Sequence, residues 1–331
     1  MTARSLRRAD AVERGERSLA ARLLRVLGIL LMASAVALSL SRAPDRPVET
    51  LVARWALPPS AFQELDGQLV HLRDVGPRDD PLPVVLLHGM SSSLHTWEGW
   101  VRGLERQRRV ITLDLPGFGL TGPRADADYR PQTDARFVLA LLDRLGVGRF
   151  VVGGNSLGGE IAWRIATQAP ERIERLILVD SAGIRVESRA LPIGWQLARV
   201  PGLNRIGEWM LPRALVADGV SKAYGGPEQA TSERVDRHFE LTLREGNRRA
   251  LAQRLASYEP GADAAQLAGI AVPTLILWGG QDQLIPPSVG REFQSRIAGS
   301  ELVLFDDLAH LPHEQDPART LVPVKAFLGL Q

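Results

Sequence analysis

The chain of 331 residues contains no cysteine. This absence excludes a thiolate nucleophile, a disulfide framework and any zinc site that is built on thiolates. Nucleophilic chemistry therefore has to use an oxygen nucleophile, with an imidazole as the usual base. Hydrophobic residues make up 45% of the sequence, which is enough to bury a sizeable core. We therefore expect a folded chain rather than a disordered one.

Lysine is almost absent, and the positive charge is concentrated near the N-terminus. Of the 40 basic residues only Lys222 and Lys325 are lysines. Residues 1–46 carry nine arginines against four acidic residues, whereas the remainder of the chain has a net negative charge. There is no basic stripe interleaved with aromatic residues, and this pattern argues against a nucleic-acid partner.

An apolar run of the length of an ordinary membrane span is also missing. The best candidate, residues 26–40 (VLGILLMASAVALSL), is uncharged but shorter than the about 20 residues of a spanning helix. A snorkelling Arg25 extends it to a marginal span. We therefore expect residues 1–46 to form a cytoplasmic basic tail with a single membrane anchor, and the catalytic domain to be periplasmic by the positive-inside rule. A cleaved signal segment that releases a secreted protein is one alternative. A buried or interfacial helix of a cytoplasmic protein is the other.

After a proline-rich link, strand-like and helix-like segments alternate. A hairpin is predicted at Asp66-Gly67, between strands at 61–65 and 69–75. Six further short apolar runs follow, at residues 83–89, 109–117, 149–155, 175–183, 273–280 and 301–307. Runs that are apolar on both faces are typical of a parallel sheet covered by helices. The sequence therefore predicts an α/β fold with a mostly parallel sheet of about eight strands.

One long interval, between Ser181 and Ala271, has no comparable strand. We interpret it as a helical cap over the carboxyl edge of the sheet, where open α/β folds bind ligands. The expected domains are the core, at residues 47–182 and 268–331, and the cap, at residues 183–267. Some cap side chains are candidates for lining an apolar pocket or, equally, for packing the cap onto the core: Trp195, Trp209, Met210 and Leu211.

Ser156 is the candidate nucleophile. The stretch VVGGNSLGG places it in a Gly-x-Ser-x-Gly pattern that occurs once in the chain. A predicted strand precedes the pattern and a predicted helix follows it, as a nucleophile turn requires. Glycines two residues before and after the serine allow a strained turn that other side chains would block. The alternative is a structural serine in a glycine-rich loop.

His310 is the candidate general base. A serine hydroxyl needs a base to take its proton, and that base should follow a late strand. His310 comes soon after the run at 301–307, and His313 is its close competitor. We expect His71 and His238 to be ordinary hairpin and cap residues, and His95 to have no base role.

The acid that orients the histidine should precede it in sequence and leave the end of a strand. Asp282 does so after the run at 273–280, and Asp180 at the end of the run at 175–183 is the alternative. Asp114 is expected to tie its own glycine-rich loop. The order Ser156, Asp282, His310 is that of the α/β-hydrolase triad.

Two backbone amides are candidates for an oxyanion hole. The amide of Leu157 lies at the start of the helix after Ser156, where helix N-terminal N–H groups favour negative charge. The His88-Gly89 turn should bring the amide of Met90 to face Ser156, with His88 bracing the loop.

Taken in order, the motifs HGM, DLPGFGLTGP, GNSLGG, WGGQD and AHLPHEQDP resemble the α/β-hydrolase fold superfamily over about residues 60–331. The resemblance implies a Ser-Asp-His mechanism without a cofactor or metal, through an acyl-enzyme that water hydrolyses. GNSLGG and WGGQD are also similar to carbon–carbon hydrolases that cleave ring-fission diketones. That subgroup usually has a tryptophan after the catalytic histidine, where this chain has Leu311. Dehalogenases and epoxide hydrolases of the superfamily have an aspartate at the position of Ser156.

The sequence therefore favours a serine hydrolase, of esterase or lipase type, that cleaves an ester, lactone or similar acyl bond of a small and partly apolar substrate. A carbon–carbon hydrolase is one alternative. A non-catalytic protein that uses the capped pocket to bind a ligand is another, although a binding module has no need of all three triad residues. The same site could also transfer the acyl group to an acceptor other than water.

Overall fold

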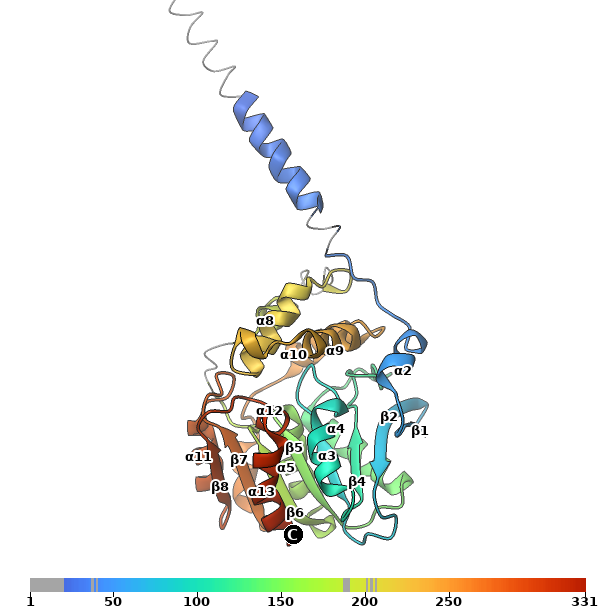
Figure 1. The fold of residues 1–331 in the computed structure, drawn as a ribbon, viewed down its shortest axis with the longest axis vertical. Helices are drawn as coiled ribbons and strands as arrows, with labels where there is room; N and C mark the ends of the chain where they lie inside the picture. The colour runs from blue at the N-terminus through green and yellow to red at the C-terminus, as the bar shows by residue number, and fades with distance from the viewer. Residues whose placement is uncertain are drawn as a thin grey trace, which may run out of the picture.

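A sheet of eight strands crosses the molecule in the order β1-β2-β4-β3-β5-β6-β7-β8 (Figure 1). The computed structural model describes residues 21–36, 39, 41–186, 191–200, 202, 205 and 207–331. β2 pairs antiparallel with β1 and β4, and all other neighbours are parallel. The strands are β1 (Ser60–Leu65), β2 (Gln68–Val75), β3 (Val84–Leu87), β4 (Val110–Leu113), β5 (Phe150–Asn155), β6 (Ile173–Val179), β7 (Thr274–Gly279) and β8 (Glu301–Phe305). The predicted fold class, a mostly parallel eight-stranded sheet with a helical cap, is confirmed.

Both faces of the sheet are buried. In β3, Val85 and Leu87 belong to one hydrophobic cluster, whereas Val84 and Leu86 belong to another. The first cluster includes side chains from α4 (Pro131–Arg144), α5 (Leu157–Gln168) and α11 (Pro287–Arg296). The second includes side chains from α3 (Glu98–Leu104) and α13 (Pro317–Leu328). Alternate residues of one apolar strand thus enter opposite layers, which explains why all four residues of β3 are apolar.

The predicted hairpin between β1 and β2 is present, and its turn follows from its two central residues. Asp66 and Gly67 both have positive φ, at 50° and 82°. Two consecutive positive φ values match the twist of antiparallel strands, and Asp-Gly is a favoured pair for such a turn.

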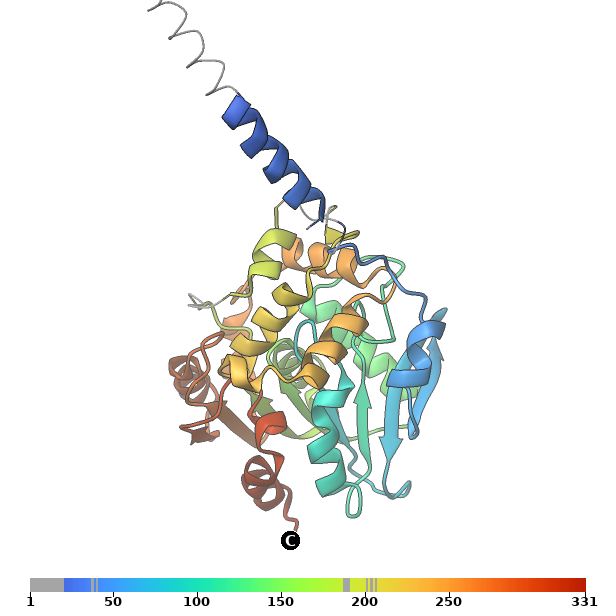
Figure 2. The ribbon, with the colours of Figure 1, turned by 45° about the horizontal axis from the view of Figure 1, so that its top comes forward.

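The cap lies between β6 and β7 in the chain. Its helices cover the carboxyl end of the parallel strands, as the yellow and orange segments of Figures 1 and 2 show. They are α6 (Ile193–Ala198), α8 (Arg213–Ala223), α9 (Ser232–Thr242) and α10 (Asn247–Ser257). The remaining short helices are α2 (Glu49–Trp55), η1 (Leu94–Trp97), η2 (Pro170–Arg172), η3 (Pro227–Gln229), η4 (Ala264–Gly269) and α12 (Pro312–Gln315).

A buried arginine fastens the last cap helix to the core. Arg254 of α10 is 1% exposed and pairs with Asp134 of α4 at 2.5 Å. It also donates hydrogen bonds to the carbonyl oxygens of Tyr129, at 2.8 Å, and Pro116, at 2.9 Å. Burial raises the pKa of Asp134, and the charge of Arg254 opposes this effect. Neither charge would be stable in the protein interior without the other.

The expected membrane anchor is wrong. In the part of the chain that the structure describes, no helix is both long enough and apolar enough to cross a membrane. Within the described residues, the helix near the N-terminus covers residues 21–36 and contains Arg22 and Arg25. The expectations of a transmembrane helix, a membrane partner and a membrane-anchored periplasmic domain are corrected accordingly. The arginine-rich residues 1–20 lie outside the described residues.

Residues 41–46 run along the cap before the chain enters the core. Isolated bridges pair Arg42 with Met210 and Arg46 with Arg244. Asp45 accepts hydrogen bonds from Arg248 of α10, at 2.6 Å from Nη2 and 3.1 Å from Nε. The segment is therefore bonded to cap residues that lie about two hundred positions later in the chain.

Candidate active site

Ser156 occupies a sharp turn between β5 and α5. Its φ of 54° and ψ of −120° are rare for a residue with a side chain and cost roughly 1–3 kcal/mol. The flanking glycines make the turn possible, because a Cβ at Gly154 would overlap Gly158, and one at Gly158 would overlap the carbonyl of Leu87. The surrounding backbone holds the turn, since Ser156 N donates to Val179 O at 3.0 Å. This is the geometry that the Gly-x-Ser-x-Gly pattern predicts.

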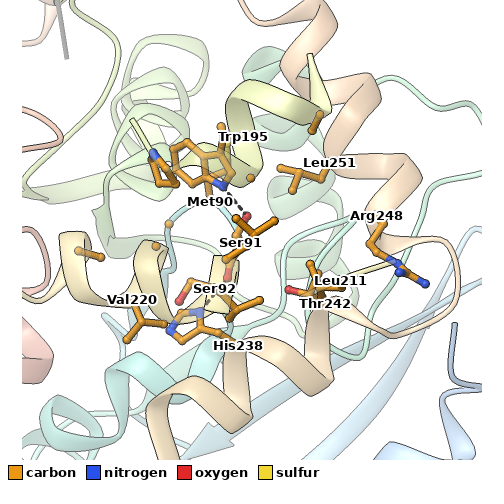
Figure 3. Close-up of a pocket in the computed structure, with 18 of the residues that line it drawn as sticks. Met90, Ser91, Ser92, Trp195, Leu211, Val220, His238, Thr242, Arg248 and Leu251 are labelled. Carbon is orange, nitrogen blue, oxygen red and sulfur yellow. Dashed lines mark hydrogen bonds between the residues drawn. The ribbon is translucent and has the colours of Figure 1, made fainter. Parts of the chain in front are cut away.

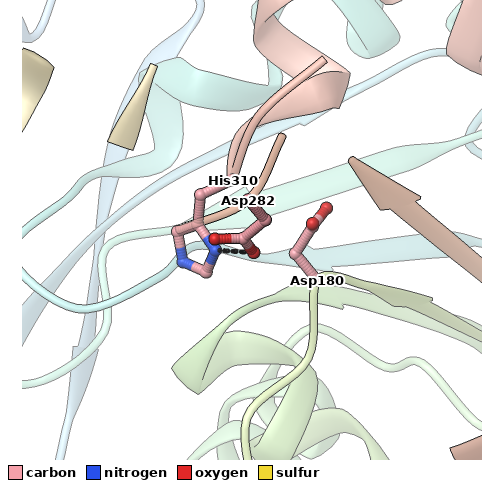
Figure 4. Close-up of side chains that lie close together, drawn as sticks. All are labelled: Asp180, Asp282 and His310. Carbon is pink, nitrogen blue, oxygen red and sulfur yellow. Dashed lines mark hydrogen bonds and ion pairs between the residues drawn. The ribbon is translucent and has the colours of Figure 1, made fainter. Parts of the chain in front are cut away.

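His310 lies on the loop between β8 and α12, beside a carboxylate from the loop after β7. Its Nδ1 is 2.6 Å from Oδ2 of Asp282 (Figure 4). The other oxygen of Asp282 accepts the backbone N–H groups of Leu284, at 2.8 Å, and Ile285, at 2.9 Å. Because a carboxylate only accepts, Nδ1 of His310 carries the proton and Nε2 keeps a lone pair. The ring is thus oriented as a base with Nε2 free to take a proton.

Asp180, the alternative acid, lies next to this pair. It follows β6 with a φ of 43°, and its Oδ1 accepts the N–H of Gly279 at 2.9 Å. Burial and the neighbouring charge of Asp282 raise the pKa of Asp180 well above its usual range. This shift favours the protonated form of Asp180, and the structure pairs the imidazole with Asp282 instead.

Asp180, Asp282 and His310 also form the one group in the described residues with converging metal-ligand atoms, which lie within 4.8 Å of one another. The raised pKa of Asp180 and the hydrogen bond between Asp282 and His310 suit proton transfer better than cation binding. We therefore assign no metal or cofactor ligands in this group.

The two candidate oxyanion donors flank the serine. Leu157 is the first residue of α5, so its N–H belongs to the unsatisfied first turn of the helix. The loop that carries Met90 passes close by, because a Cβ at Gly89 would lie 3.1 Å from the Cβ of Ser156. His88 braces this loop, as Nδ1 donates to Gly89 O at 2.8 Å and Nε2 accepts Leu115 N–H at 2.9 Å. Burial lowers the pKa of His88, which keeps it neutral.

Ser156 and His310 line one cavity of about 340 Å³ beneath the cap. Its volume is within the roughly 300–1000 Å³ of small-molecule sites. Apolar side chains of core and cap form most of its wall. Figure 3 labels Met90, Trp195, Leu211 and Leu251 among them, and Met210 and Leu284 also belong to the lining. Trp209, the fourth cap residue that the sequence singled out, is 66% exposed and does not line the cavity.

One cationic side chain, Arg248, belongs to the described lining of this cavity. Its guanidinium is already engaged, since Asp45 accepts from two of its nitrogens and Gly207 O accepts from Nη1 at 3.0 Å. The positive charge is thus neutralised by the segment that precedes the core.

The other histidines have separate structural partners. Nδ1 of His71 is 2.7 Å from Asp114, which also accepts the N–H groups of Leu94 and Leu120 and so ties the glycine-rich loop. Nε2 of His95 is 2.9 Å from Trp55 O. The ring of His313 is fully buried, with its centroid 4.0 Å from that of the Trp97 ring.

Sequence reasoning missed one residue of the site, His238. We expected it to be an ordinary cap residue, yet it lines the cavity and its Nδ1 is 2.9 Å from Ser91 O. No motif surrounds it, and its contact spans 147 positions of the chain. Only the packing of the cap on the core brings the two residues together.

Comparison with known proteins agrees with this geometry. The family model described as alpha/beta hydrolase fold matches residues 83–216 and 220–317. The chain therefore belongs to the alpha/beta hydrolase fold family. The predicted resemblance is confirmed, and with it the expectation of an enzyme of the hydrolase class.

Individual relatives show how varied the family is. The chain is 29% identical over 254 residues to the 2-hydroxy-6-oxononadienedioate/2-hydroxy-6-oxononatrienedioate hydrolase of Escherichia coli (strain K12), covering 73% of this chain and 84% of the relative. It is 29% identical over 272 residues to the dihydrolipoyllysine-residue acetyltransferase component of the acetoin cleaving system of Pseudomonas putida, covering 80% and 68%. A solved hydrolase from Pseudomonas aeruginosa PA01 has 29% identity and a TM-score of 0.68, covering 82% of this chain and 99% of that one.

Proposed function

We propose that this chain is a serine hydrolase that cleaves an ester, lactone or similar acyl bond of a small, largely apolar and uncharged substrate. Ser156 is the nucleophile, His310 the general base and Asp282 the acid that orients it. The amides of Met90 and Leu157 bind the oxyanion. The observation that carries the proposal is the strained turn at Ser156, which opens into the same cavity as a histidine bonded to a buried carboxylate.

The reaction follows from these positions. Oγ of Ser156 attacks the acyl carbon and its proton passes to Nε2 of His310, giving a tetrahedral intermediate whose oxyanion accepts from the two amides. When the intermediate collapses, the bond to the leaving alcohol breaks and His310 returns the proton to that alcohol. Water then attacks the acyl-enzyme in the same way and releases the acid. Asp282 stays ionised and stabilises the imidazolium in both steps.

The cavity favours an uncharged acyl substrate over a dicarboxylate. Its wall is mainly apolar, and its described cationic side chain, Arg248, is paired with Asp45. A substrate carboxylate bound there would have to displace Asp45 or remain unpaired, and leaving a charge unpaired in a buried site costs several kcal/mol.

A carbon–carbon hydrolase is the second candidate, because a relative at 29% identity is named for hydrolysis of a dioate. That activity requires the same serine, histidine and aspartate. A dioate substrate would, however, bring two negative charges to a mainly apolar wall, where Arg248 is already paired with Asp45.

A fluorophosphonate probe tests the nucleophile. We expect it to label the folded protein covalently at Ser156 and not to label Ser156→Ala. Folded protein that resists the probe would contradict the proposal and favour a ligand-binding role. A series of p-nitrophenyl esters of rising chain length, run beside a ring-fission diketone, then separates the candidates. Hydrolysis of the diketone without hydrolysis of any ester would support the carbon–carbon reaction.

A further inference from the structure

Two side chains of the cap hold one residue of the loop that follows β3. Trp195 of α6 donates from Nε1 to Oγ of Ser91 at 3.1 Å. His238 of α9 donates from Nδ1 to the carbonyl oxygen of the same serine at 2.9 Å. Figure 3 shows Trp195 and His238 on opposite sides of Ser91, with a dashed line from each. Two cap helices that are separate in sequence thus meet at one core residue.

Ser91 directly follows Met90, and its backbone is strained. Its φ of 56° lies in the left-handed region, which residues with a side chain rarely adopt. Such strain costs roughly 1–3 kcal/mol and persists where the surroundings over-determine the conformation. The two cap hydrogen bonds are directed at this strained residue. They therefore supply contacts that can keep the loop in the conformation that Met90 needs.

The chemistry of His238 fixes the direction of its bond. A carbonyl oxygen only accepts, so Nδ1 of His238 carries the proton. Burial and the nearby charge of Arg237 lower the pKa of His238 to about 4, which keeps the ring neutral at pH 7. Its Nε2 is buried, with no hydrogen-bond partner among the described residues. The polar function of this ring in the described structure is thus to hold Ser91.

The held loop is in contact with the catalytic turn. A Cβ at Gly89 would lie 3.1 Å from the Cβ of Ser156 and 2.9 Å from Oδ1 of Asn155. There is little space for the loop to shift without moving against the nucleophile. Oxyanion donors act over about 2.7–3.1 Å, so a small displacement at Ser91 changes what the neighbouring amide of Met90 can bind.

We propose that His238 and Trp195 are positioning residues that hold the amide of Met90 toward Ser156, so that the oxyanion hole is complete only when the cap is seated on the core. The proposal rests on the proposed function, because it needs Ser156 as nucleophile and Met90 as donor. Under this proposal, residues of the cap contribute to stabilising the transition state.

A matched pair of variants at one position tests this proposal. In His238→Asn the amide nitrogen takes the place of Nδ1 and can still donate to Ser91. In His238→Gln the nitrogen falls near Nε2 and the bond to Ser91 is lost. Complete loss of an oxyanion donor lowers kcat by about 10²–10³-fold, so we expect kcat of His238→Gln to fall at least about tenfold, and kcat of His238→Asn to stay within about threefold of the parent.

Two readouts separate positioning from packing. KM for a short ester should change little in either variant, since the bond acts on the transition state rather than on the bound substrate. A trifluoromethyl ketone forms a tetrahedral oxyanion on the serine, so its Ki should rise in His238→Gln by about the factor that kcat loses. Trp195→Phe, which keeps the ring but removes the donor, should show the same pattern more weakly.

The contrary results are distinct. Parental kcat and Ki in His238→Gln would overturn the proposal, while leaving the serine hydrolase intact. Equal losses in both variants, together with equal falls in melting temperature, would also overturn it, because they indicate packing alone. If the parent protein neither hydrolyses esters nor reacts with a fluorophosphonate, the proposed function fails and the positioning role fails with it.

Discussion

Nδ1 of His310 and Oδ2 of Asp282 lie 2.6 Å apart, although 28 positions separate the two residues in the chain. Asp282→Asn keeps the shape of the side chain but presents an amide to the imidazole, which favours the wrong tautomer. We expect kcat to fall by about 10³–10⁴-fold, with KM changed much less. Steady-state kinetics on a p-nitrophenyl ester measure the effect. A loss of less than about tenfold would mean that another acid orients His310.

Asp180 provides the matched comparison for Asp282. Burial and the charge of Asp282 raise the pKa of Asp180 well above its usual range, which favours the neutral carboxyl. Asp180→Asn puts a neutral amide of the same shape where the neutral carboxyl is favoured, so we expect kcat/KM within about threefold of the parent. The same ester assay serves for both variants. Should Asp180→Asn lose as much activity as Asp282→Asn, the roles assigned to the two carboxyl groups would have to be exchanged.

The cavity wall predicts a change in chain-length preference. Gly219 of α8 lines the cavity, and among the described residues a Cβ placed there would meet Pro192 Cβ, at 3.7 Å, and nothing closer. Gly219→Phe should fill part of the space and lower kcat/KM for an octanoate ester relative to an acetate ester by at least about tenfold. Gly219→Ala is the control, since it adds little volume and removes a glycine from the interior of a helix, which should stabilise the protein by about 0.5–1 kcal/mol. An unchanged preference in Gly219→Phe would place the acyl chain elsewhere.

The buried pair between Arg254 and Asp134 predicts a large effect on stability. Arg254→Met leaves the fully buried Asp134 without its counter-charge, so we expect the free energy of unfolding to fall by about 3–5 kcal/mol. Urea denaturation at neutral pH measures the change. The double variant Arg254→Met/Asp134→Asn should recover part of the loss, because no buried charge remains. Equal stability of the single and double variants would show that the charge of Asp134 is not the cause.

His313 predicts a dependence of stability on pH. Burial lowers its pKa to about 3, whereas an unfolded imidazole has a pKa of about 6.5. Between these values the unfolded chain binds the extra proton, so the free energy of unfolding falls as the pH drops below about 6.5. At pH 5 this one group should cost about 2 kcal/mol.

The variant His313→Phe keeps a ring against Trp97 and cannot be protonated. Denaturation of both proteins at pH 7.5 and pH 5 should show a fall in stability that is about 2 kcal/mol smaller in the variant. His313→Leu serves as a second variant if phenylalanine disturbs the packing. Parallel pH dependences in all three proteins would contradict the assignment.

The sequence predicted the fold because the features that define it are local. Each strand is a short apolar run. The turn at Ser156 is recognisable from Gly154 and Gly158, because a Cβ at either position would overlap neighbouring backbone. The candidate acid was harder to choose, since Asp180 and Asp282 both follow strands that end at the same edge of the sheet. Only coordinates show which carboxylate meets the imidazole ring.

Contacts between distant segments could not be predicted, because they are not local in the sequence. The bond between His238 and Ser91 depends on how the cap helices sit on the core, and no spacing or periodicity encodes that docking. The membrane anchor was a different kind of error. It extended an apolar run that was too short by counting a flanking arginine as part of the span, whereas no described helix is both long enough and apolar enough to cross a membrane.

Asp45 lies in the segment of residues 41–46, which precedes the core, and its carboxylate pairs with Arg248. The charge at the cavity wall is therefore set partly by a segment outside the core. A chain shortened to begin after residue 46 would leave the guanidinium of Arg248 at the cavity wall without its carboxylate partner. The proposed catalytic residues would then face a pocket with an unbalanced positive charge, and we expect that pocket to attract anions in place of the apolar acyl group proposed for the intact chain.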